Sequence, residues 1–481
     1  MKKILELLKK HYELIGYSLL TILLFGSCFS RVFALVTAVY IFIFAFLLHS
    51  ETKIIALAIF FKCFSGLFST NNFLGQFNVA NVVIGELTLA ICLFYLIRVI
   101  KKEIKINWKL LISLGVFLVY LILPFHEWSW RDLFAEISFY AILYVVFETR
   151  QEIDCLYLIN VFIVGLIISC GFSLLRGVSP YLSQILPVTT VHKKFRFQGL
   201  FEHPNLLAVI LVGALSGLLF MKYKNKINLV KFLVYFIPLF IFGYLTLARL
   251  FVLNVAVALI IFAIFELIQH KTKVVPLLLV LVAVVGSVSL ICFDQTKFII
   301  SRGDEGVTNY INTGKQGTGS SGSQIVTNPS SPYHSGVLKG KTEEWAKKVF
   351  AGEVRFDPGR KGFYELYFMD WSSSPKIIWF GRGISRPNIG RMNAHNQYLY
   401  FLWQHGIVGC IFFGVVILSI VKWKNLKTWK QYLPILILLI PYFLITLIEV
   451  RVGDYSLITL ILAAGNLLQQ KSDKDLDDNN L

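Results

Sequence analysis

Apolar runs of about 16 to 22 residues recur from one end of the chain to the other, and each is long enough to cross a hydrocarbon layer of roughly 30 Å. They lie at 13–30, 32–49, 54–69, 80–99, 109–125, 133–149, 154–175, 205–221, 230–247, 250–269, 274–293, 396–421, 432–448 and 455–469. Hydrophobic residues make up 56% of the chain and charged residues only 15%, so a soluble fold would leave large apolar patches exposed. The sequence therefore predicts an all-α polytopic membrane protein with about 14 transmembrane helices.

Four lysine-rich connectors give the expected orientation. They are 101–109, 222–226, 270–273 and 422–430. If the N-terminus is cytoplasmic, the order of the apolar runs places all four on the cytoplasmic side, as the positive-inside rule requires. The first run follows several lysines but shows no clear small-residue cleavage site, so we expect a retained helix and no signal peptide. The prediction is a multi-pass protein of the cytoplasmic (inner) membrane with both termini in the cytoplasm.

One exterior segment is too long to be a simple connector. Residues 294–392 separate two apolar runs by about a hundred residues, whereas most connections are far shorter. The chain is thus divided into a transmembrane domain at 1–293 with spans 1–11, an extracytoplasmic loop subdomain at 294–392, a transmembrane domain at 393–469 with spans 12–14, and an acidic cytoplasmic tail at 470–481. The Gly/Ser-rich part of the loop, 303–336, is predicted to be flexible.

Several function classes fit this sequence poorly. The seven cysteines form no C-x-x-C or Cys/His pattern, so neither a disulfide framework nor a zinc site is indicated, and we expect no metal ion or other cofactor. The net charge of +18 does not indicate a nucleic-acid partner, because the lysines gather in short loops between apolar runs. The centres of the runs are mostly Leu, Ile, Phe and Val, with Glu86 as the main exception. Transporters typically place charge in mid-membrane or break their helices.

Cationic and polar side chains concentrate instead at the predicted outer surface of the membrane. They are His192, Lys193, Lys194, Arg196, His203, Asn205, Arg249, Arg360, Arg382, Arg386, Arg391, His395, Asn396, Glu449 and Arg451. An excess of cations on this side runs against the usual bias. It suits an anionic substrate at the outer leaflet, such as a lipid pyrophosphate, because the planar fork of arginine binds phosphate oxygens in bidentate fashion.

Arg249 lies in the very short exterior turn LTLARLF (245–251). Its guanidinium must therefore lie at or just below the membrane interface. One interpretation is an arginine that extends to the interface and fixes the depth of its helix. The other is a phosphate ligand in a cleft that excludes water.

Three segments with motif-like patterns stand at the outer ends of predicted spans. They are RFQGLFEHPNLLA (196–208), TLARLFVL (246–253) and WFGRGISRPNIGRMNAHNQYLYFLWQHGIVG (379–409). In this order, and with one large exterior loop before the His-Asn pair, they resemble the O-antigen ligase and Wzy-type polysaccharide polymerase superfamily. The similar family patterns are R-x-x-G-x-x-x-x-P-N, T-x-S-R and G-x-G … H-N-x-Y-L … G-x-x-G. Ala248 stands where the family commonly has Ser, and Arg360 is similar to the arginine that precedes the third block.

This resemblance implies a GT-C-like membrane glycosyltransferase that acts on an undecaprenyl-pyrophosphate-linked glycan, without a metal ion and with inversion. It implies that His395 is the catalytic base, since histidine titrates near neutral pH and suits a sugar hydroxyl. It also implies a set of pyrophosphate ligands, namely Arg196, Arg249 and Arg382. The secondary substrate-binding or orienting residues would be His203, Asn205, Arg360, Asn396, Tyr398 and Arg451.

Most of these residues have a structural alternative that the sequence leaves open. His395 and Asn205 could cap or hydrogen-bond the start of a helix. Tyr398 could anchor its helix at the membrane interface, and Arg360 could form a salt bridge within the loop. His405, which lies well inside the apolar run, is expected to pack against Gly406 or a neighbouring helix.

The sequence thus predicts a polymerase that joins undecaprenyl-pyrophosphate-linked repeat units into a capsular, exo- or O-antigen polysaccharide at the outer face of the membrane. Its expected partners are the glycan donor, the glycan acceptor, membrane lipid and a chain-length regulator protein. An O-antigen ligase or a protein O-oligosaccharyltransferase is the alternative within this class, because the donor chemistry is shared. A transporter or flippase for lipid-linked glycan is the alternative from another class.

Overall fold

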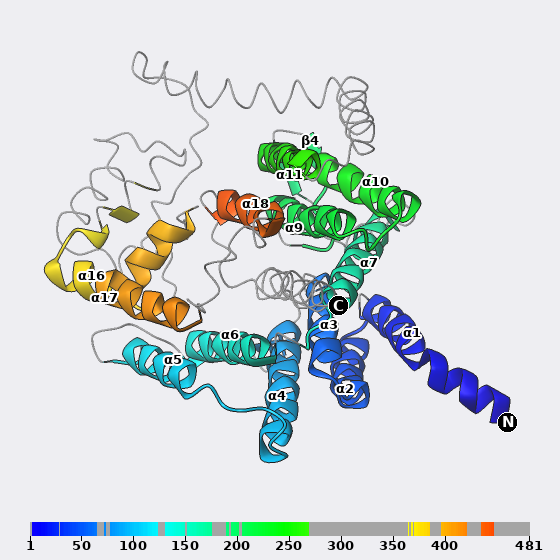
Figure 1. Cartoon of the computed structure of the whole chain (residues 1–481), viewed down its shortest axis with the longest axis horizontal. Coiled ribbons are helices and arrows are strands. Elements are labelled where there is room, and N and C mark those ends of the chain that lie inside the picture. Colours follow the sequence, from blue (N-terminus) through cyan, green and yellow to red (C-terminus); the bar gives the residue numbers. More distant parts are fainter. Residues whose placement is uncertain are drawn as a thin grey trace, which may run out of the picture.

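The computed structural model describes a helical, membrane-embedded protein (Figure 1). The described residues are 2–27, 29–64, 72–73, 77–123, 130–149, 152–175, 189–191, 194–201, 204–268, 364, 367–368, 370–384, 396–420 and 434–446. Among them, four helices are long and apolar enough to cross a membrane, at Val82–Ile100, Cys155–Leu174, Pro204–Tyr223 and Tyr398–Val416. Shorter apolar helices lie at His11–Gly26, Val32–Leu48, Trp108–Leu121, Leu229–Leu245 and Phe251–Glu266.

The elements follow one another as helices with two short strand pairs in the connectors. The helices of the first part are α1 (Lys2–Gly26), α2 (Arg31–Leu48), α3 (Glu51–Lys62), α4 (Val79–Ile100), α5 (Trp108–Leu121), α6 (Trp130–Thr149) and α7 (Cys155–Leu174). Those of the second part are α9 (Pro204–Tyr223), α10 (Leu229–Leu245), α11 (Arg249–Ile268), α16 (Pro375–Phe380), α17 (Gln397–Ile420) and α18 (Leu436–Thr446). The antiparallel strand pairs are β1 (Asn72–Phe73) with β2 (Phe77–Asn78) and β3 (Thr189–Val191) with β4 (Lys194–Arg196).

Each predicted span that falls on described residues coincides with a helix. The clearest difference is at 54–69, where α3 ends at Lys62 because the next two N–H groups bond to carbonyls three residues earlier. Its 12 residues extend about 18 Å at roughly 1.5 Å per residue, less than the hydrocarbon layer. The predicted spans 274–293 and 455–469 lie outside the described residues, so the total of about 14 spans stays a prediction.

Polar residues in the connectors fix where the apolar helices begin. The side chains of Ser30, Asn107, Asp154 and Asn228 accept backbone N–H groups in the first turns of α2, α5, α7 and α10, respectively. Such caps satisfy N–H groups that have no partner within the helix, and each is typically worth about 1 kcal/mol. The short polar breaks between apolar runs are therefore also helix-starting signals.

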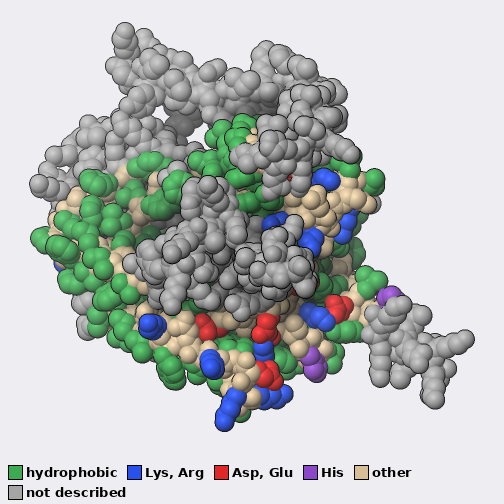
Figure 2. Space-filling model, in the orientation of Figure 1, with side chains coloured by type: hydrophobic (Ala, Val, Ile, Leu, Met, Phe, Trp, Pro, Cys, Tyr) green, Lys and Arg blue, Asp and Glu red, His purple; other side chains and the backbone are tan. Residues whose placement is uncertain are grey.

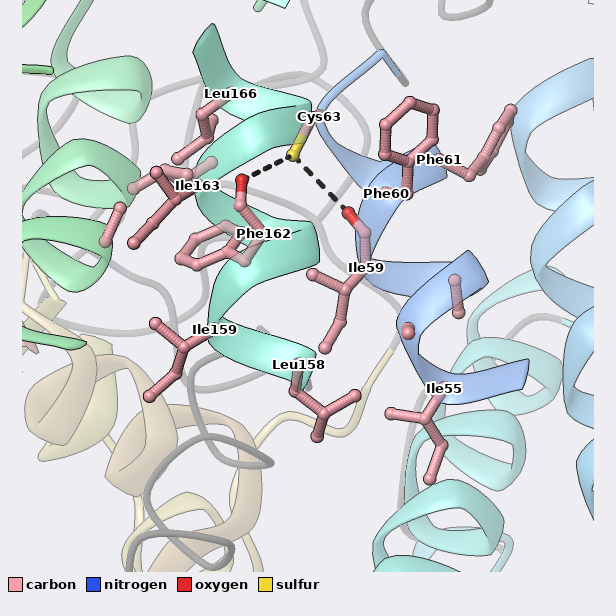
Figure 3. Packing of buried hydrophobic residues seen from close by; sticks show 14 of the residues in the cluster. Ile55, Ile59, Phe60, Phe61, Cys63, Leu158, Ile159, Phe162, Ile163 and Leu166 are labelled. Carbon is pink, nitrogen blue, oxygen red and sulfur yellow. Dashed lines mark hydrogen bonds between the residues drawn. The ribbon is translucent and has the colours of Figure 1, made fainter. Parts of the chain in front are cut away.

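The core is built around α9, which lies between α7, α10, α11 and α18 (Figure 1). Within Pro204–Tyr223, 89% of the 18-residue apolar window is buried inside the protein. A second close contact joins α3 and α7, where Cys63 lies among aliphatic and aromatic side chains and its thiol donates to the carbonyl of Ile59 at 3.4 Å (Figure 3). Gly165 permits this approach, because a Cβ there would lie 3.0 Å from the ring of Phe60. Cys63 thus packs as a small buried hydrophobe.

One group of charged side chains joins three connectors. The guanidinium of Arg98 lies 3.0 Å from a carboxylate oxygen of Glu51, 3.2 Å from Glu103 and 2.6 Å from Glu152. We call these four residues the Arg98 cluster. Figure 2 shows acidic and basic side chains together on one part of the visible face, with hydrophobic side chains over much of its rim. All four residues belong to helix ends or connectors that the sequence places in the cytoplasm, so this is the arrangement that the predicted topology requires.

Candidate functional site

The segment 194–201 packs against the end of α10 and the start of α9. The N–H of Phe197 donates to the carbonyl of Leu245 at 3.0 Å, and its ring stacks on that of Phe242 with centroids 5.5 Å apart. Gly199 has a φ of +58°, which side-chain-bearing residues rarely adopt, and a Cβ there would lie 3.3 Å from Leu207. The hairpin β3–β4 and the turn that follows therefore hold Arg196 at a fixed backbone position.

Arg196 is the last residue of β4, and its side chain is only 3% exposed. Its Nε donates to the carbonyl oxygen of Thr246 at 2.9 Å, and its Nη2 donates to Oδ1 of Asn205 at 2.9 Å. Asn205 is the second residue of α9, and Thr246 follows α10. The first two motif segments of the sequence are therefore joined through this one guanidinium.

The turn between α10 and α11 is tight and internally bonded. The hydroxyl of Thr246 donates to the carbonyl of Gly243 at 2.6 Å and accepts the N–H of Ala248 at 3.2 Å. Leu247 adopts a left-handed backbone with a φ of 52°. Arg249 is then the first residue of α11, three positions after the residue that Arg196 contacts. The hydroxyl of Thr246 thus holds this turn.

Asn396, the second residue of the His-Asn pair, stands immediately before α17. Asn396 caps this helix, because its side-chain oxygen accepts an N–H of the first turn at 3.0 Å. Tyr398 is 45% exposed, and its ring centroid lies 5.6 Å from that of Phe443 in α18. Since α18 packs against both α9 and α11, this contact links the start of α17 to the helices of the first two motifs.

Other predicted site residues cannot be placed. His203, Arg360, His395 and Arg451 lie outside the described residues, and of Arg249 the backbone alone is described. Their proposed roles stay predictions.

The helix α17 is interrupted at Gly406, whose backbone (φ 63°, ψ −174°) is not helical. Carbonyl groups ahead of this break accept hydrogen bonds from outside the helix. The bonds are Arg382 N to Trp403 O (2.9 Å), Gly383 N to Gln404 O (2.8 Å) and Tyr120 Oη to His405 O (2.6 Å). Non-helical backbone at membrane depth is tolerated where protein buries it and satisfies its polar groups. Here the segment after α16 and a tyrosine of α5 do so.

Two glycines allow this close backbone approach. Gly381 has a φ of +76°, and a Cβ on it would overlap the carbonyl of Gln404. A Cβ on Gly406 would overlap the backbone of Trp379 and Gly381. The segment at 379–381 and the helix α17 therefore meet at a point where a larger residue in place of either glycine must push them apart.

A buried carboxylate lies beside this contact. Asp370 is fully buried and accepts Nε of Arg382 at 2.9 Å, Nη2 of Arg382 at 2.6 Å and Nε1 of Trp403 at 2.6 Å. We call these three residues the Asp370 clamp. The structure thus gives Arg382, predicted as a third pyrophosphate ligand, a bidentate partner within the protein.

His405 is buried as expected for a packing residue. Its side chain is 2% exposed, and its ring lies 4.3 Å from Phe401 and 5.7 Å from Phe117, measured between centroids. It lies immediately before the break at Gly406, and its surroundings are aromatic.

Sequence reasoning missed Asp370, Trp403 and Tyr120. A signal for Asp370 exists, because it is an acidic residue within the aromatic stretch GFYELYFMDW (362–371), and a carboxylate among apolar residues needs partners. Tyr120 left no such signal, since its partners lie 260 and 285 residues further along the chain.

A scan against protein-family models, a search of curated proteins and a search of solved structures each gave no match to this chain. The resemblance stated for the three segments therefore stays a prediction.

Proposed function

We propose that this protein is a metal-independent, inverting glycosyltransferase of the cytoplasmic membrane. It joins undecaprenyl-pyrophosphate-linked oligosaccharide repeat units into a surface polysaccharide on the extracytoplasmic face. The proposal includes the GT-C-like arrangement of about 14 spans with both termini in the cytoplasm. Its partners would be the lipid-linked donor, the glycan acceptor, membrane lipid and a chain-length regulator.

The observation that carries the proposal is the oriented guanidinium of Arg196. Its bonds to Thr246 and Asn205 go to neutral oxygens, so these bonds orient the group without cancelling its charge. A cation held in place before the reaction stabilises a leaving pyrophosphate more than a mobile one, because no reorganisation is needed when negative charge develops. Arg249, at the start of the adjoining α11, is the second cation of this proposed site.

The reaction assigns one task to each group. His395 accepts the proton of the acceptor hydroxyl, whose oxygen attacks the anomeric carbon of the donor from the face opposite the pyrophosphate. The new glycosidic bond forms as the bond between the anomeric carbon and the pyrophosphate oxygen breaks. The electron pair leaves with undecaprenyl pyrophosphate, whose negative charge Arg196 and Arg249 stabilise. His395 then releases its proton to water.

The Arg98 cluster supports the predicted order of the spans, because its members come from connectors that this order places on one side. Its four residues come from positions that the topology places in the cytoplasm, and the structure brings them together. Arg196, Asn205, Thr246 and Asn396 belong to the opposite ends of their helices in the same topology. In this proposal the site lies on the side opposite the Arg98 cluster, which the predicted topology makes extracytoplasmic.

A flippase for lipid-linked glycan is the second candidate, and the break in α17 is the observation that favours it. Transporters often use interrupted helices to present carbonyl groups to a transported ion or substrate. In α17, however, the carbonyls of Trp403, Gln404 and His405 accept hydrogen bonds from Arg382, Gly383 and Tyr120. The break serves contact within the protein, which favours the transferase.

Replacement of His395 by Ala tests the transferase directly. We expect loss of about 10²–10⁴-fold in polymer formation, because the acceptor proton has no base. The glycan ladder on gels measures this, with immunoblotting of membranes to show that the protein is present. A full ladder from the His395→Ala variant would refute the base assignment, and a flippase would tolerate the change. A single addition to a non-repeat acceptor in place of a ladder would identify a ligase.

Arg249 has a matched control in Arg31, because each is the first residue of an apolar helix and each is predicted to be exterior. If Arg249 is a phosphate ligand, Arg249→Ala abolishes the ladder while Arg31→Ala keeps it. Equal, small effects of the two substitutions would return Arg249 to the role of an interfacial anchor.

A further inference from the structure

We propose that the Asp370 clamp positions the catalytic base of the proposed reaction. In this role Arg382 holds the segment 370–384, which precedes α17 in the chain, against α17 and so sets the position of His395. The inference rests on the proposed function and assigns Arg382 a different task from pyrophosphate binding. Three observations support this role: the hydrogen bonds that Asp370 accepts, the contact of the clamp with α17 through Trp403, and the backbone hydrogen bonds beside the clamp.

The guanidinium of Arg382 binds a carboxylate within the protein. Its Nε and Nη2 both donate to Asp370, and the side chain is only 10% exposed while the carboxylate is fully buried. A bidentate pair of this kind both compensates the charge and uses the planar edge with which arginine would bind phosphate. The same edge of Arg196 donates to Thr246 and Asn205, whose oxygens are neutral, so the two arginines differ in the charge of these acceptors.

The clamp contacts the first half of α17 through Trp403. Trp403, the third member, belongs to α17 and lies seven positions after its cap Asn396, which corresponds to about 10 Å along a helix. Its ring stacks on Tyr400 with centroids 5.8 Å apart and meets Tyr367 edge-on at 4.9 Å. Both tyrosines are buried, so the clamp is packed against the first turn that Asn396 caps. A shift of Asp370 or Arg382 is therefore transmitted to the start of α17.

Backbone contacts between this segment and α17 remain when the clamp is weakened. The N–H groups of Arg382 and Gly383 bond to α17 through the backbone, and Tyr120 bonds to the carbonyls of Phe380 and His405. These contacts do not depend on the side chain of Arg382. Asp370→Asn and Arg382→Gln proteins are therefore expected to keep the segment on α17 but to hold it less rigidly. A loss of rigidity near a catalytic base lowers turnover more than it lowers substrate binding.

Binding of undecaprenyl pyrophosphate to the purified full chain in nanodiscs separates ligands from positioning residues. We expect Asp370→Asn and Arg382→Gln to bind this lipid as the wild type does. Arg196→Gln should weaken binding about tenfold or more, because a charge-assisted bond is lost. Weaker binding in Arg382→Gln with normal binding in Asp370→Asn would make Arg382 a ligand and overturn the positioning role.

Turnover is measured with the native lipid-linked repeat unit, extracted from cells that lack the protein. We expect kcat to fall by up to about 100-fold in either single variant, with KM unchanged. The double variant Asp370→Asn/Arg382→Gln should be no slower than the singles, since both remove one interaction. Arg382→Lys should restore kcat only in part, because it keeps the charge but lacks the fork.

The double variant also separates positioning from stability alone. A lone buried charge lowers the amount of folded protein, whereas the neutral pair should restore that amount. If the double variant recovers both folded protein and kcat, the clamp only stabilises the fold and the inference is wrong. Failure of the proposed function looks different, because His395→Ala and Arg196→Gln would then leave both turnover and lipid binding unchanged.

Discussion

The Arg98 cluster and the Asp370 clamp use the same cation in opposite surroundings. Arg98 has three carboxylate partners, two of which are about half exposed, at 48% for Glu103 and 57% for Glu152. Arg382 has one carboxylate partner, Asp370, which is fully buried. Water can replace Glu103 or Glu152, although Glu51 is only 10% exposed, whereas nothing described beside Asp370 except Trp403 can replace Arg382. Arg98 forms more ion pairs than Arg382, yet the protein depends more strongly on the single ion pair of Arg382.

The difference follows from the solvation of charge. Exposed pairs gain little because water already solvates both ions, and measured values are typically about 0.2–1 kcal/mol. Removal of one partner from a buried pair leaves an uncompensated ion in a medium of low polarity, and costs about 3–5 kcal/mol. The Arg98 cluster can therefore tolerate change at its two exposed acids, while the clamp requires all of its members together.

The largest effect should come from the backbone contact beside the clamp. Gly406→Ala forces a side chain into the backbone of Trp379 and Gly381 at a positive φ, and we expect a loss of more than about 4 kcal/mol in the free energy of unfolding. Unfolding by SDS titration in mixed micelles measures it. The matched control is Gly414→Ala in the same helix, where a Cβ meets nothing within 4 Å. Equal stability of the two variants would show that α17 is not held by this contact.

The next effect compares the two arginines directly. Arg382→Ala should lower the free energy of unfolding by about 3–5 kcal/mol, because Asp370 then keeps a buried charge. Arg98→Ala should lower it by less, because two of the three acids that it leaves, Glu103 and Glu152, are about half exposed and water can solvate them. The same SDS titration gives both values. A larger loss for Arg98 than for Arg382 would reverse the comparison.

The smallest effect should come from a single exposed acid of the Arg98 cluster. Glu103→Gln removes the 3.2 Å contact with Arg98 and should cost at most about 1 kcal/mol, with the difference shrinking as salt is added. Thermal unfolding in detergent at low and high salt measures this. A large effect that salt does not reduce would show that Glu103 is desolvated in the membrane-embedded protein.

Helix positions were predictable because each apolar run is a local property of the sequence. The helices α2, α7, α9 and α10 begin within one residue of the predicted spans, where polar residues interrupt the runs. The break at Gly406 was not predictable in this way, because a lone glycine is common in membrane helices. Its meaning lies in Gly381 and Tyr120, which reach it from distant parts of the chain.

The candidate site likewise contains some contacts that the sequence predicts and others that it does not. Arg196 and Asn205 belong to one motif, so their proximity follows from the sequence, whereas the bond from Arg196 to Thr246 depends on how α9 packs on α10. The partner of Arg382 could not be predicted, because Asp370 lies in an aromatic stretch whose fold the sequence does not specify. Long-range polar contacts of this kind are set by packing, and a single sequence gives no direct signal for them.

The enclosure of α9 has a consequence for the order in which the protein is assembled. This helix is hydrophobic enough to enter the bilayer alone, yet one of its neighbours, α18, begins roughly 200 residues later in the chain. At about 5–20 residues per second, synthesis leaves an interval of roughly 10–40 s before α18 can cover it. During that time lipid must solvate the face of α9 that α18 later occupies. Biogenesis therefore includes a late exchange of lipid for protein, and ribosomes stalled before residue 434 should hold α9 in a state that hydrophobic photo-crosslinkers in the bilayer can label.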